Sequence, residues 1–443
     1  MNILESLDEL KKEAQRQNLE FDAIAEEKFE TGLELFKGKV IQTEVASSTG
    51  VGIRVIKNKR CGFSFTEKLS AETVKEMINN AVENAQVSDE TELETASAFS
   101  LPEKELEIYN EELEKVDLNY LKNMALEIEE NAYNENSLIK NIPHLGMGKS
   151  FKKTYVLNSQ GVFFEKKSNA ISGGLSVYAE KNGSAKSGYY VRGGRKTDIF
   201  IASEIAKEAV ARAVDLLEAK PVKSGKYPVV FSNRTASRLF SMFLSSFFAE
   251  NVQKGQSRLA GKLGQKTAVD NLSLISDPHL INGAGSTLFD DEGTIAEKLY
   301  LIKDGTLESY LYNLESAAKE NRKSTGHGKR GYASQVSTGI WNILLEKSDA
   351  FIDDLLSSKD KCLYITELEG GAGCSQVSGE ISIGAQGFLI EKGQKIRPVD
   401  EITLSANFFE LLLNIEMISN SYSDDFSKVK IPDLLVQEIH VAG

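Results

Sequence analysis

The chain has 443 residues, of which 41% are hydrophobic and 26% are charged, and its formal net charge is −13 at pH 7. A chain of this length exceeds one ordinary domain core, so we expect two or three domains. The acidic balance repels phosphate backbones and argues against direct binding of nucleic acid.

An amphipathic helix is predicted over residues 3–15. Its acidic start differs from the basic and then apolar start of a signal peptide, so we expect no export. Residues 21–65 read as strands with a turn at 57–59. Ser70 then occupies an N-cap position before a helix whose apolar residues follow a three and four spacing.

Residues 88–114 are acidic and weakly periodic, which indicates a linker or an exposed excursion. Asp117 caps the next predicted helix, and two hairpins follow with turns at 158–161 and 182–183. A further helix over 202–219 stops before Pro221. We therefore predict an N-terminal domain at 1–105, a central domain at 106–220 and a C-terminal domain at 221–443.

The C-terminal half opens with a strand over 227–231 and a dense apolar helix that includes residues 239–248. Hairpins are predicted at 303–305 and 391–393, and a late helix begins at Asn407 with an apolar face that reaches Ile418. Hairpins rather than helical crossovers join the strands. The predicted fold class is therefore α+β, with antiparallel sheets, flanking helices and a C-terminal domain larger than the N-terminal region.

Three isolated cysteines, Cys61, Cys362 and Cys374, match neither a disulfide framework nor a CxxC zinc spacing, which indicates a reducing compartment. No stretch is apolar enough over about 20 residues to span a bilayer. We expect a cytoplasmic protein without a membrane partner.

Six short motifs occur along the chain. They are GVGIRV at 50–55 with Gly62-Phe63, LNSQG at 157–161, FDDEG at 289–293, STGHGKR at 324–330, GAQGFLIEKG at 384–393 and PVDEITL at 398–404. In this order they resemble the TldD/PmbA family, and within it the PmbA (TldE) branch. The resemblance covers nearly the whole chain and includes the family's older description as a modulator of DNA gyrase.

The metal-binding branch of that family, TldD, resembles a zinc peptidase with an HExxxH helix and a further cysteine ligand near the C-terminus. The matching stretch of this chain, residues 243–250, reads FLSSFFAE, and no histidine lies between His144 and His279. Residues 416–443 contain no cysteine. The resemblance therefore implies no metal ligand and no cofactor here, with zinc expected only in a TldD-type partner.

One candidate substrate cleft joins two of the motifs, and its residues are Asp290, Asp291, Glu292, Gly293, Thr325, Gly326 and His327. The acidic run lacks the alternating spacing of a calcium loop, so a turn capped by carboxylates is the competing interpretation. His327 stands where the family usually carries Asn.

A nucleophile is the second candidate site, because Cys374 and Ser375 follow the glycine-rich residues 370–373. No GxSxG elbow surrounds them and no histidine is near in sequence. Phe240, Phe243, Phe247 and Phe248 are expected in a core or a subunit interface.

Two main functions remain open. In the first, the chain is a non-metal subunit or paralogue of a peptidase complex for unfolded peptides, paired with a TldD-type chain or with itself. In the second, it is an independent hydrolase that uses Cys374 or Ser375, or a peptidase with an unrecognised metal site. An indirect effect on DNA gyrase is a third, non-enzymatic possibility.

Overall fold

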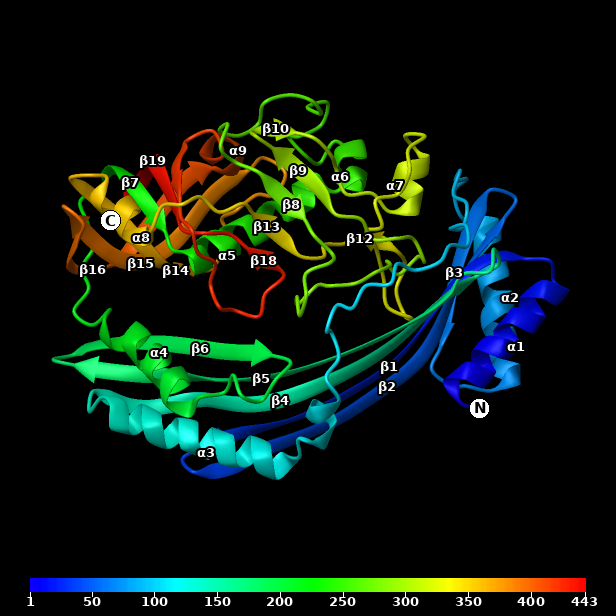
Figure 1. Cartoon of the computed structure of the whole chain (residues 1–443), viewed down its shortest axis with the longest axis horizontal. Helices are drawn as coiled ribbons and strands as arrows, with labels where there is room; N and C mark the ends of the chain where they lie inside the picture. Colours follow the sequence, from blue (N-terminus) through cyan, green and yellow to red (C-terminus); the bar gives the residue numbers. More distant parts are fainter.

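The base of the molecule is a long, curved six-stranded sheet, seen in the computed structural model of residues 1–443 (Figure 1). Its order is β3-β2-β1-β4-β5-β6, and every neighbouring pair is antiparallel. The strands are β1 (Glu20–Phe36), β2 (Lys39–Lys57), β3 (Arg60–Thr66), β4 (Ile139–Asn158), β5 (Phe163–Lys181) and β6 (Ser184–Gly194). The predicted turns at 57–59, 158–161 and 182–183 are confirmed.

Strands from the first two predicted domains pair with each other in this sheet, through β1 and β4. Main-chain hydrogen bonds therefore join the segments on either side of residue 105. The predicted boundaries at 105/106 and 220/221 stay predictions.

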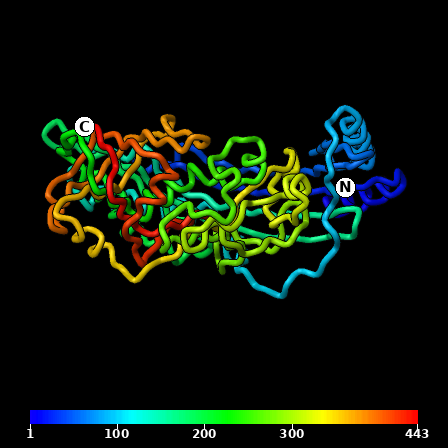
Figure 2. Tube along the Cα trace, turned by 90° about the horizontal axis from the view of Figure 1, so that it is seen from above, coloured from blue at the N-terminus to red at the C-terminus, as the bar shows by residue number.

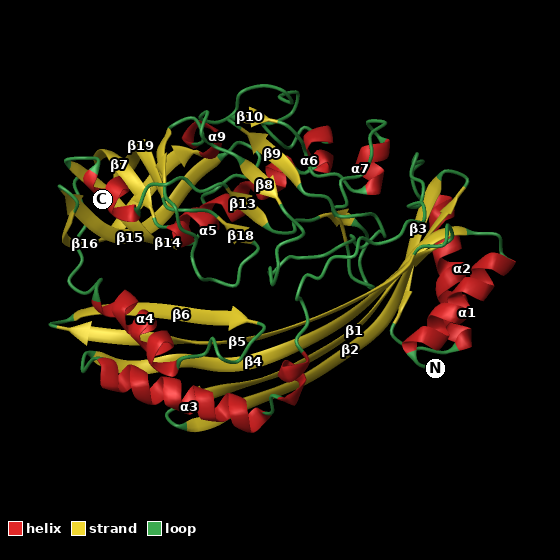
Figure 3. Ribbon diagram, in the orientation of Figure 1, coloured by secondary structure: helices red, strands yellow, loops and turns green.

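Two pairs of helices cover the ends of the sheet (Figure 3). They are α1 (Ile3–Arg16) with α2 (Ala71–Val87), and α3 (Leu118–Glu135) with α4 (Ala202–Val214). Ser70 and Asp117 cap α2 and α3 as predicted, each accepting a hydrogen bond from the backbone N–H three residues on. Helix α4 ends five residues before the predicted limit of 219, because the chain turns there and Glu218 adopts a φ of 60°.

The segment after α2 runs outside regular structure until the 3₁₀ helix η1 (Glu111–Lys115), and Figure 2 shows it as an extended trace along the body. Leu93, Ala96 and Leu106 are buried along it. The segment is thus an irregular connection that packs on the body through a few buried apolar side chains.

The C-terminal body lies above the sheet in Figure 1 and contains the largest apolar core. One six-stranded sheet has the order β16-β15-β14-β7-β19-β17, a five-stranded sheet has the order β10-β9-β8-β13-β18, and β11 pairs with β12. The strands of the first sheet are β7 (Gly225–Phe231), β14 (Lys361–Glu369), β15 (Glu380–Glu391), β16 (Gln394–Asn407), β17 (Ile415–Ile418) and β19 (Leu434–Ala442). The others are β8 (Leu274–Ser276), β9 (Leu299–Lys303), β10 (Thr306–Leu307), β11 (Gly328–Lys329), β12 (Ser337–Thr338), β13 (Ile343–Leu345) and β18 (Val429–Lys430).

Short helices complete the body: α5 (Asn233–Phe243), the 3₁₀ turn η2 (Leu244–Phe247), α6 (Ala249–Gln253), α7 (Leu314–Ala318), α8 (Ile352–Ser357) and α9 (Phe408–Leu411). The α+β class is confirmed, and both hairpins at 303–305 and 391–393 are present. Two strand pairs, β7 with β14 and β13 with β18, are parallel, so the body is not built from hairpins alone. No helix has the length and apolarity needed to cross a membrane.

Two predicted helices of the body were too long. The apolar stretch over 239–248 breaks after Phe243, which adopts φ −115° and ψ 0°, into a 3₁₀ turn and then α6. The late helix is a single turn, because Ile415 and Ile418 pair with β19 as strand β17. Asn407 caps that turn by accepting from Phe409 N, and Glu410 completes no capping box.

Candidate functional site

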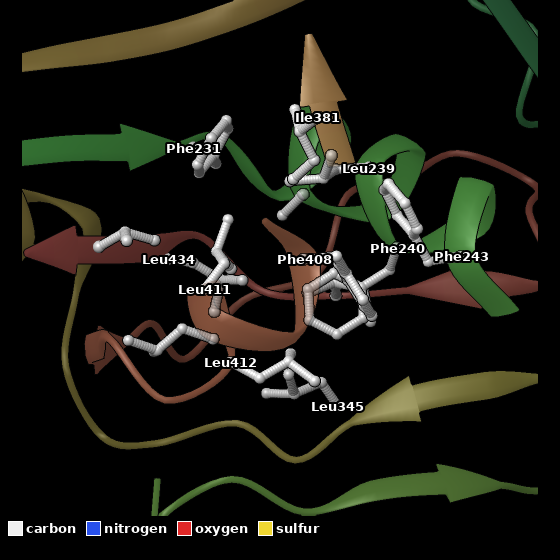
Figure 4. Close-up of a cluster of buried hydrophobic side chains, with 14 of the residues drawn as sticks. Phe231, Leu239, Phe240, Phe243, Leu345, Ile381, Phe408, Leu411, Leu412 and Leu434 are labelled. Atoms are coloured by element: carbon white, nitrogen blue, oxygen red, sulfur yellow. The ribbon is translucent and has the colours of Figure 1, made fainter. Parts of the chain in front are cut away.

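Helix α5 has two chemically different faces. Its apolar face enters the core, where the rings of Phe240 and Phe243 lie 5.2 and 4.5 Å from the ring of Phe408 (Figure 4). The expectation that these phenylalanines belong to a core is therefore confirmed, and the core is that of the chain itself. The helix starts at Ser232, whose hydroxyl accepts from Thr235 N.

The polar face of α5 borders a pocket of about 190 Å³ between the long sheet and the C-terminal body. From α5 it is lined by Arg234, Thr235, Ser237, Arg238 and Ser241, and from other elements by Tyr189 of β6, Glu367 of β14, Ser423, Asp425 and Ser427. The pocket residues of α5 precede the stretch 243–250 in the sequence, and no residue of that stretch lines the pocket.

Arg234 organises the charges of the pocket. Its Nη1 lies 3.1 Å from Glu367 Oε1, its Nε lies 4.0 Å from Asp425 Oδ2, and its guanidinium sits 4.5 Å above the ring of Tyr189. Burial raises the pKa of Glu367, and the nearby Arg234 and Arg238 oppose that rise. Both carboxylates of the pocket thus face an arginine that is always charged.

The residues present do not fit a zinc ion. Zinc sites in peptidases use imidazole or thiolate ligands with carboxylates, and the pocket offers no histidine or cysteine. No group of three or more His, Cys, Asp and Glu side chains in the chain is placed to hold a metal ion. In the stretch 243–250, Phe243 and Phe247 are fully buried, while the Ser245 hydroxyl donates to Gln376 Oε1 at 2.7 Å.

The two motifs that carry the seven predicted cleft residues lie side by side as one unit, joined by hydrogen bonds between Asp290, Asp291 and Gly328. Asp290 caps its own turn, with Oδ1 accepting from Glu292 N at 3.0 Å and from Thr294 N at 2.9 Å. Asp290 Oδ2 accepts from Gly328 N at 2.8 Å, which ties the acidic run to the motif that contains His327. The geometry is that of a turn capped by carboxylates.

Little of this unit faces solvent. Thr325 is partly exposed and the other six residues are buried. His327 Nε2 lies 2.9 Å from Ser276 Oγ, and burial lowers the pKa of its imidazole to about 4. His327 is therefore a neutral, hydrogen-bonded side chain inside the body, and the role of the seven residues as a substrate cleft stays a prediction.

A buried network of ion pairs that includes Glu292 was not predicted from the sequence. Arg54 of β2 donates to Asp22 Oδ2 from Nε at 2.9 Å and from Nη2 at 2.5 Å, and Nη2 also reaches Glu292 Oε1 at 2.8 Å. Arg330 lies on the other side of Asp22, with an Nη2–Oδ1 distance of 2.6 Å. Since Arg54 and Glu292 are 238 positions apart, no local spacing could have shown the contact.

The nucleophile candidates lie in the glycine-rich loop between β14 and β15. Ser375 Oγ accepts from Ser378 N at 3.2 Å, and Cys374 is partly exposed. No side-chain hydrogen bond joins either residue to a histidine or a carboxylate; Ser375 and Cys374 otherwise make backbone bonds only. The loop thus supplies no neighbouring base that would activate a thiol or a hydroxyl.

The fold is α+β, and the pocket on α5 is lined by arginine, serine and carboxylate side chains without histidine or cysteine. Family models named PmbA/TldA metallopeptidase match residues 21–85 as domain 1, 111–217 as the central domain and 224–443 as the C-terminal domain. The chain belongs to the PmbA/TldD metallopeptidase family.

Relatives and solved structures agree with this membership. The metalloprotease PmbA of Escherichia coli O157:H7 is 28% identical over 420 residues, which cover 92% of this chain and 88% of the relative. A metalloprotease TldD homolog of Buchnera aphidicola is 25% identical over 86% of this chain and 80% of its own length. The crystal structure of a proposed modulator of a DNA gyrase from Thermotoga maritima superposes with a TM-score of 0.91 at 29% identity and full coverage of both chains. TldE from Thermococcus kodakarensis shares the fold, with a TM-score of 0.88 at 22% identity over 99% of this chain and all of its own.

Proposed function

We propose that this chain is a non-metal-binding subunit, or a paralogue of one, in a TldD/TldE-type metalloprotease complex that degrades unfolded peptides in the cytoplasm. The observation that carries the proposal is a metallopeptidase fold without a metal donor set. The polar face of α5 presents arginine, serine and threonine, and the two carboxylates opposite it are engaged by Arg234. A hydrolytic water needs a Lewis acid or a free base, and the pocket has no histidine or cysteine to hold a metal ion, while Arg234 lies beside both of its carboxylates.

The partner in this proposal is a TldD-type chain that holds the zinc ion, with a second copy of this chain as the alternative. The apolar helix at 239–248 lends no support to an intersubunit surface, since Leu239, Phe240, Phe243 and Phe247 are at most 1% exposed within one chain. Of the two places expected for these phenylalanines, a core or a subunit interface, the core of the chain itself accounts for their burial. Pairing is therefore expected through other surfaces of the fold.

A reconstitution assay tests the proposal. Hydrolysis of casein or of an unstructured peptide is measured with this chain, with a TldD-type chain and with both, each with and without a chelator, and zinc is measured in each preparation. We expect activity only when the TldD-type chain is present, loss of that activity with chelator, and no stoichiometric zinc in this chain. Chelator-sensitive hydrolysis by this chain alone, or about one zinc per chain, would contradict the proposal.

The independent hydrolase predicts a different pattern in the same assay. Its activity would resist the chelator and disappear in Cys374→Ala or Ser375→Ala, whereas the partner-subunit proposal expects no effect of either variant on the reconstituted activity. An indirect action on DNA gyrase predicts that the purified chain leaves supercoiling unchanged and that any effect requires the peptidase partner.

A further inference from the structure

A cavity of about 320 Å³ lies between the long sheet and the C-terminal body, and it shares no residue with the pocket on α5. Its walls come from the end of the sheet that carries β3, from the segment after α2 and from the body around α7 and β12 (Figure 1). Small-molecule sites occupy about 300–1,000 Å³, so this cavity suits a small ligand. We call it the arginine cavity, and its lining includes Arg54, Phe63, Asp89, Leu93, Arg330 and Val336.

Two arginines that share one carboxylate form the floor of the arginine cavity. Arg54 Nη2 lies 2.5 Å from Asp22 Oδ2, and Arg330 Nη2 lies 2.6 Å from Asp22 Oδ1. Arg54 makes its other contacts through Nε to Asp22 and through Nη2 to Glu292. Arg330 Nε donates to the main-chain oxygen of Asp291 at 3.1 Å.

Each of these guanidinium groups keeps one nitrogen without an acceptor. The side chains of Arg54 and Arg330 are only 8% and 0% exposed. Nη1 of Arg330 is buried and has no hydrogen-bond partner, and Nη1 of Arg54 donates no hydrogen bond within the chain. Buried donors without acceptors are rare because they are costly, so these two nitrogens point to a ligand. A carboxylate supplies two oxygens for them, and hydrogen bonds between charged groups of this kind are strong.

The balance of charge decides what else the ligand must carry. Asp22 and Glu292 already balance the two arginines, so the floor offers hydrogen-bond donors without surplus positive charge. A ligand carboxylate therefore needs a positive charge of its own. The mouth of the cavity has a place for that charge, because Asp89 is exposed and forms no ion pair, whereas Glu90 lies 3.6 Å from Arg60.

The walls between floor and mouth are apolar. Phe63 pairs with Arg54 across β3 and β2, so both side chains lie on the same face of the sheet. Leu93 is 4% exposed, and Val336 precedes β12. An aliphatic side chain fits against these three residues.

We propose that the arginine cavity binds a small aliphatic zwitterion, either a free amino acid such as leucine or a dipeptide. Its carboxylate accepts from Nη1 of Arg54 and Nη1 of Arg330. Its ammonium group lies at Asp89, and its side chain packs on the apolar walls. The site is independent of the metalloprotease proposal, since it involves no residue of the pocket on α5.

Titration calorimetry of the full chain with leucine and with glycyl-leucine tests the site. We expect saturable binding at pH 7, with leucine the tighter ligand if the site takes a free amino acid and glycyl-leucine the tighter if it takes a dipeptide. Leucinamide lacks the carboxylate and 4-methylpentanoate lacks the ammonium group, so each should bind at least about tenfold more weakly. Absence of saturable binding for both zwitterions, or an analogue that binds as tightly as the better of them, would overturn the proposal.

Variants at the mouth and the wall leave the buried arginines intact. Asp89→Asn should weaken binding by about tenfold, and Val336→Trp should abolish it by filling the cavity from a partly exposed position. The matched controls are Asp8→Asn, at an exposed position of α1, and Val377→Trp, at a position that is 50% exposed outside the cavity. Melting temperatures show that each variant is folded. Unchanged affinity in Asp89→Asn or Val336→Trp, or an equal loss in its control, contradicts the assignment.

Discussion

Replacing Arg54 by methionine removes the centre of the buried ion network. Arg54 on β2 donates to Asp22 within the sheet and to Glu292 of the C-terminal body, so one guanidinium joins the two layers. Methionine fills part of the space but leaves Glu292 Oε1 without its partner, while Asp22 keeps Arg330 at 2.6 Å. The variant therefore buries one unpaired carboxylate and weakens the pairing of a second.

The expected loss of stability follows from this change. Breaking a buried ion pair by removing one partner costs about 3–5 kcal/mol. If the whole chain of 443 residues unfolds as one unit, an unfolding entropy of about 2.1 cal/mol/K per residue converts that loss into a melting temperature lower by about 3–5 °C. A smaller cooperative unit would show a larger decrease.

The pH dependence of this effect has a definite sign. Burial raises the pKa of Asp22, but Arg330 and Arg54 outweigh it and the net pKa is lowered, so the ionised Asp22 stabilises the fold above about pH 4. Burial raises the pKa of Glu292, and Arg54 opposes this. Without Arg54 the pKa of Glu292 should rise further. The difference between variant and wild type should thus shrink between pH 7 and pH 5, as Glu292 takes up a proton.

Scanning calorimetry at pH 7 and pH 5 measures both effects. Arg16→Met is the matched control, because Arg16 pairs with Glu13 at 2.7 Å through a side chain that is 64% exposed, and such pairs contribute at most about 0.5 kcal/mol. The reasoning would be refuted if Arg54→Met had the same melting temperature as Arg16→Met. It would also be refuted if the difference in melting temperature between Arg54→Met and the wild type were equal at pH 7 and pH 5.

Three further predictions concern single buried groups. His327→Gln should flatten the pH dependence of stability between about pH 6.5 and pH 4. Burial lowers the pKa of His327 to about 4, so the unfolded chain binds a proton that the folded chain does not, and the free energy of unfolding of the wild type falls by up to about 3 kcal/mol as the pH drops through that window. Urea titrations at several pH values measure this difference. Gly52→Ala should destabilise the fold by about 1–3 kcal/mol in the same titrations, because its Cβ would clash with the backbone carbonyl oxygen of Tyr332, and a neutral result would contradict this packing. Cys362 should resist alkylation in the native state and react only on unfolding, since it is fully buried and burial raises its thiol pKa to about 11; peptide mass spectrometry that finds Cys362 modified before Cys374 would disprove this.

Local signals in the sequence predicted local structure well. Ser70 and Asp117 cap their helices, and the Asn182-Gly183 pair forms the hairpin turn between β5 and β6, because each depends on a few adjacent backbone groups. The prediction of the late helix was wrong beyond its first turn. Ile415 and Ile418 fit a helix face and a strand equally well, and pairing with β19 places them in a strand.

Of the candidate site, only the lack of histidines could be predicted from the sequence. The missing histidines of the α5 region are visible in the sequence, but the partners of Arg234, Glu367 on β14 and Asp425 in a loop, are brought to it by the fold alone. The ion network depends likewise on contacts between segments that are far apart in sequence. Asp290 and its neighbours were recognised as a motif, and the structure adds that their carboxylates face inward.

Apolar core packing holds α5 in place without any contribution from metal ligands in its own pocket. In a small metal domain the ligands contribute the folding free energy, so their loss unfolds the chain. Here α5 is held instead by apolar contacts, with Phe240 and Phe243 against Phe408 in a core of 45 buried residues. The polar face of α5 adds no side chain to that apolar core, and its buried Thr235 and Ser237 are held by hydrogen bonds with Ile365 O and Ile431 N. A chelator should therefore leave the melting temperature of this chain unchanged, even where it abolishes the activity of a complex with a TldD-type partner.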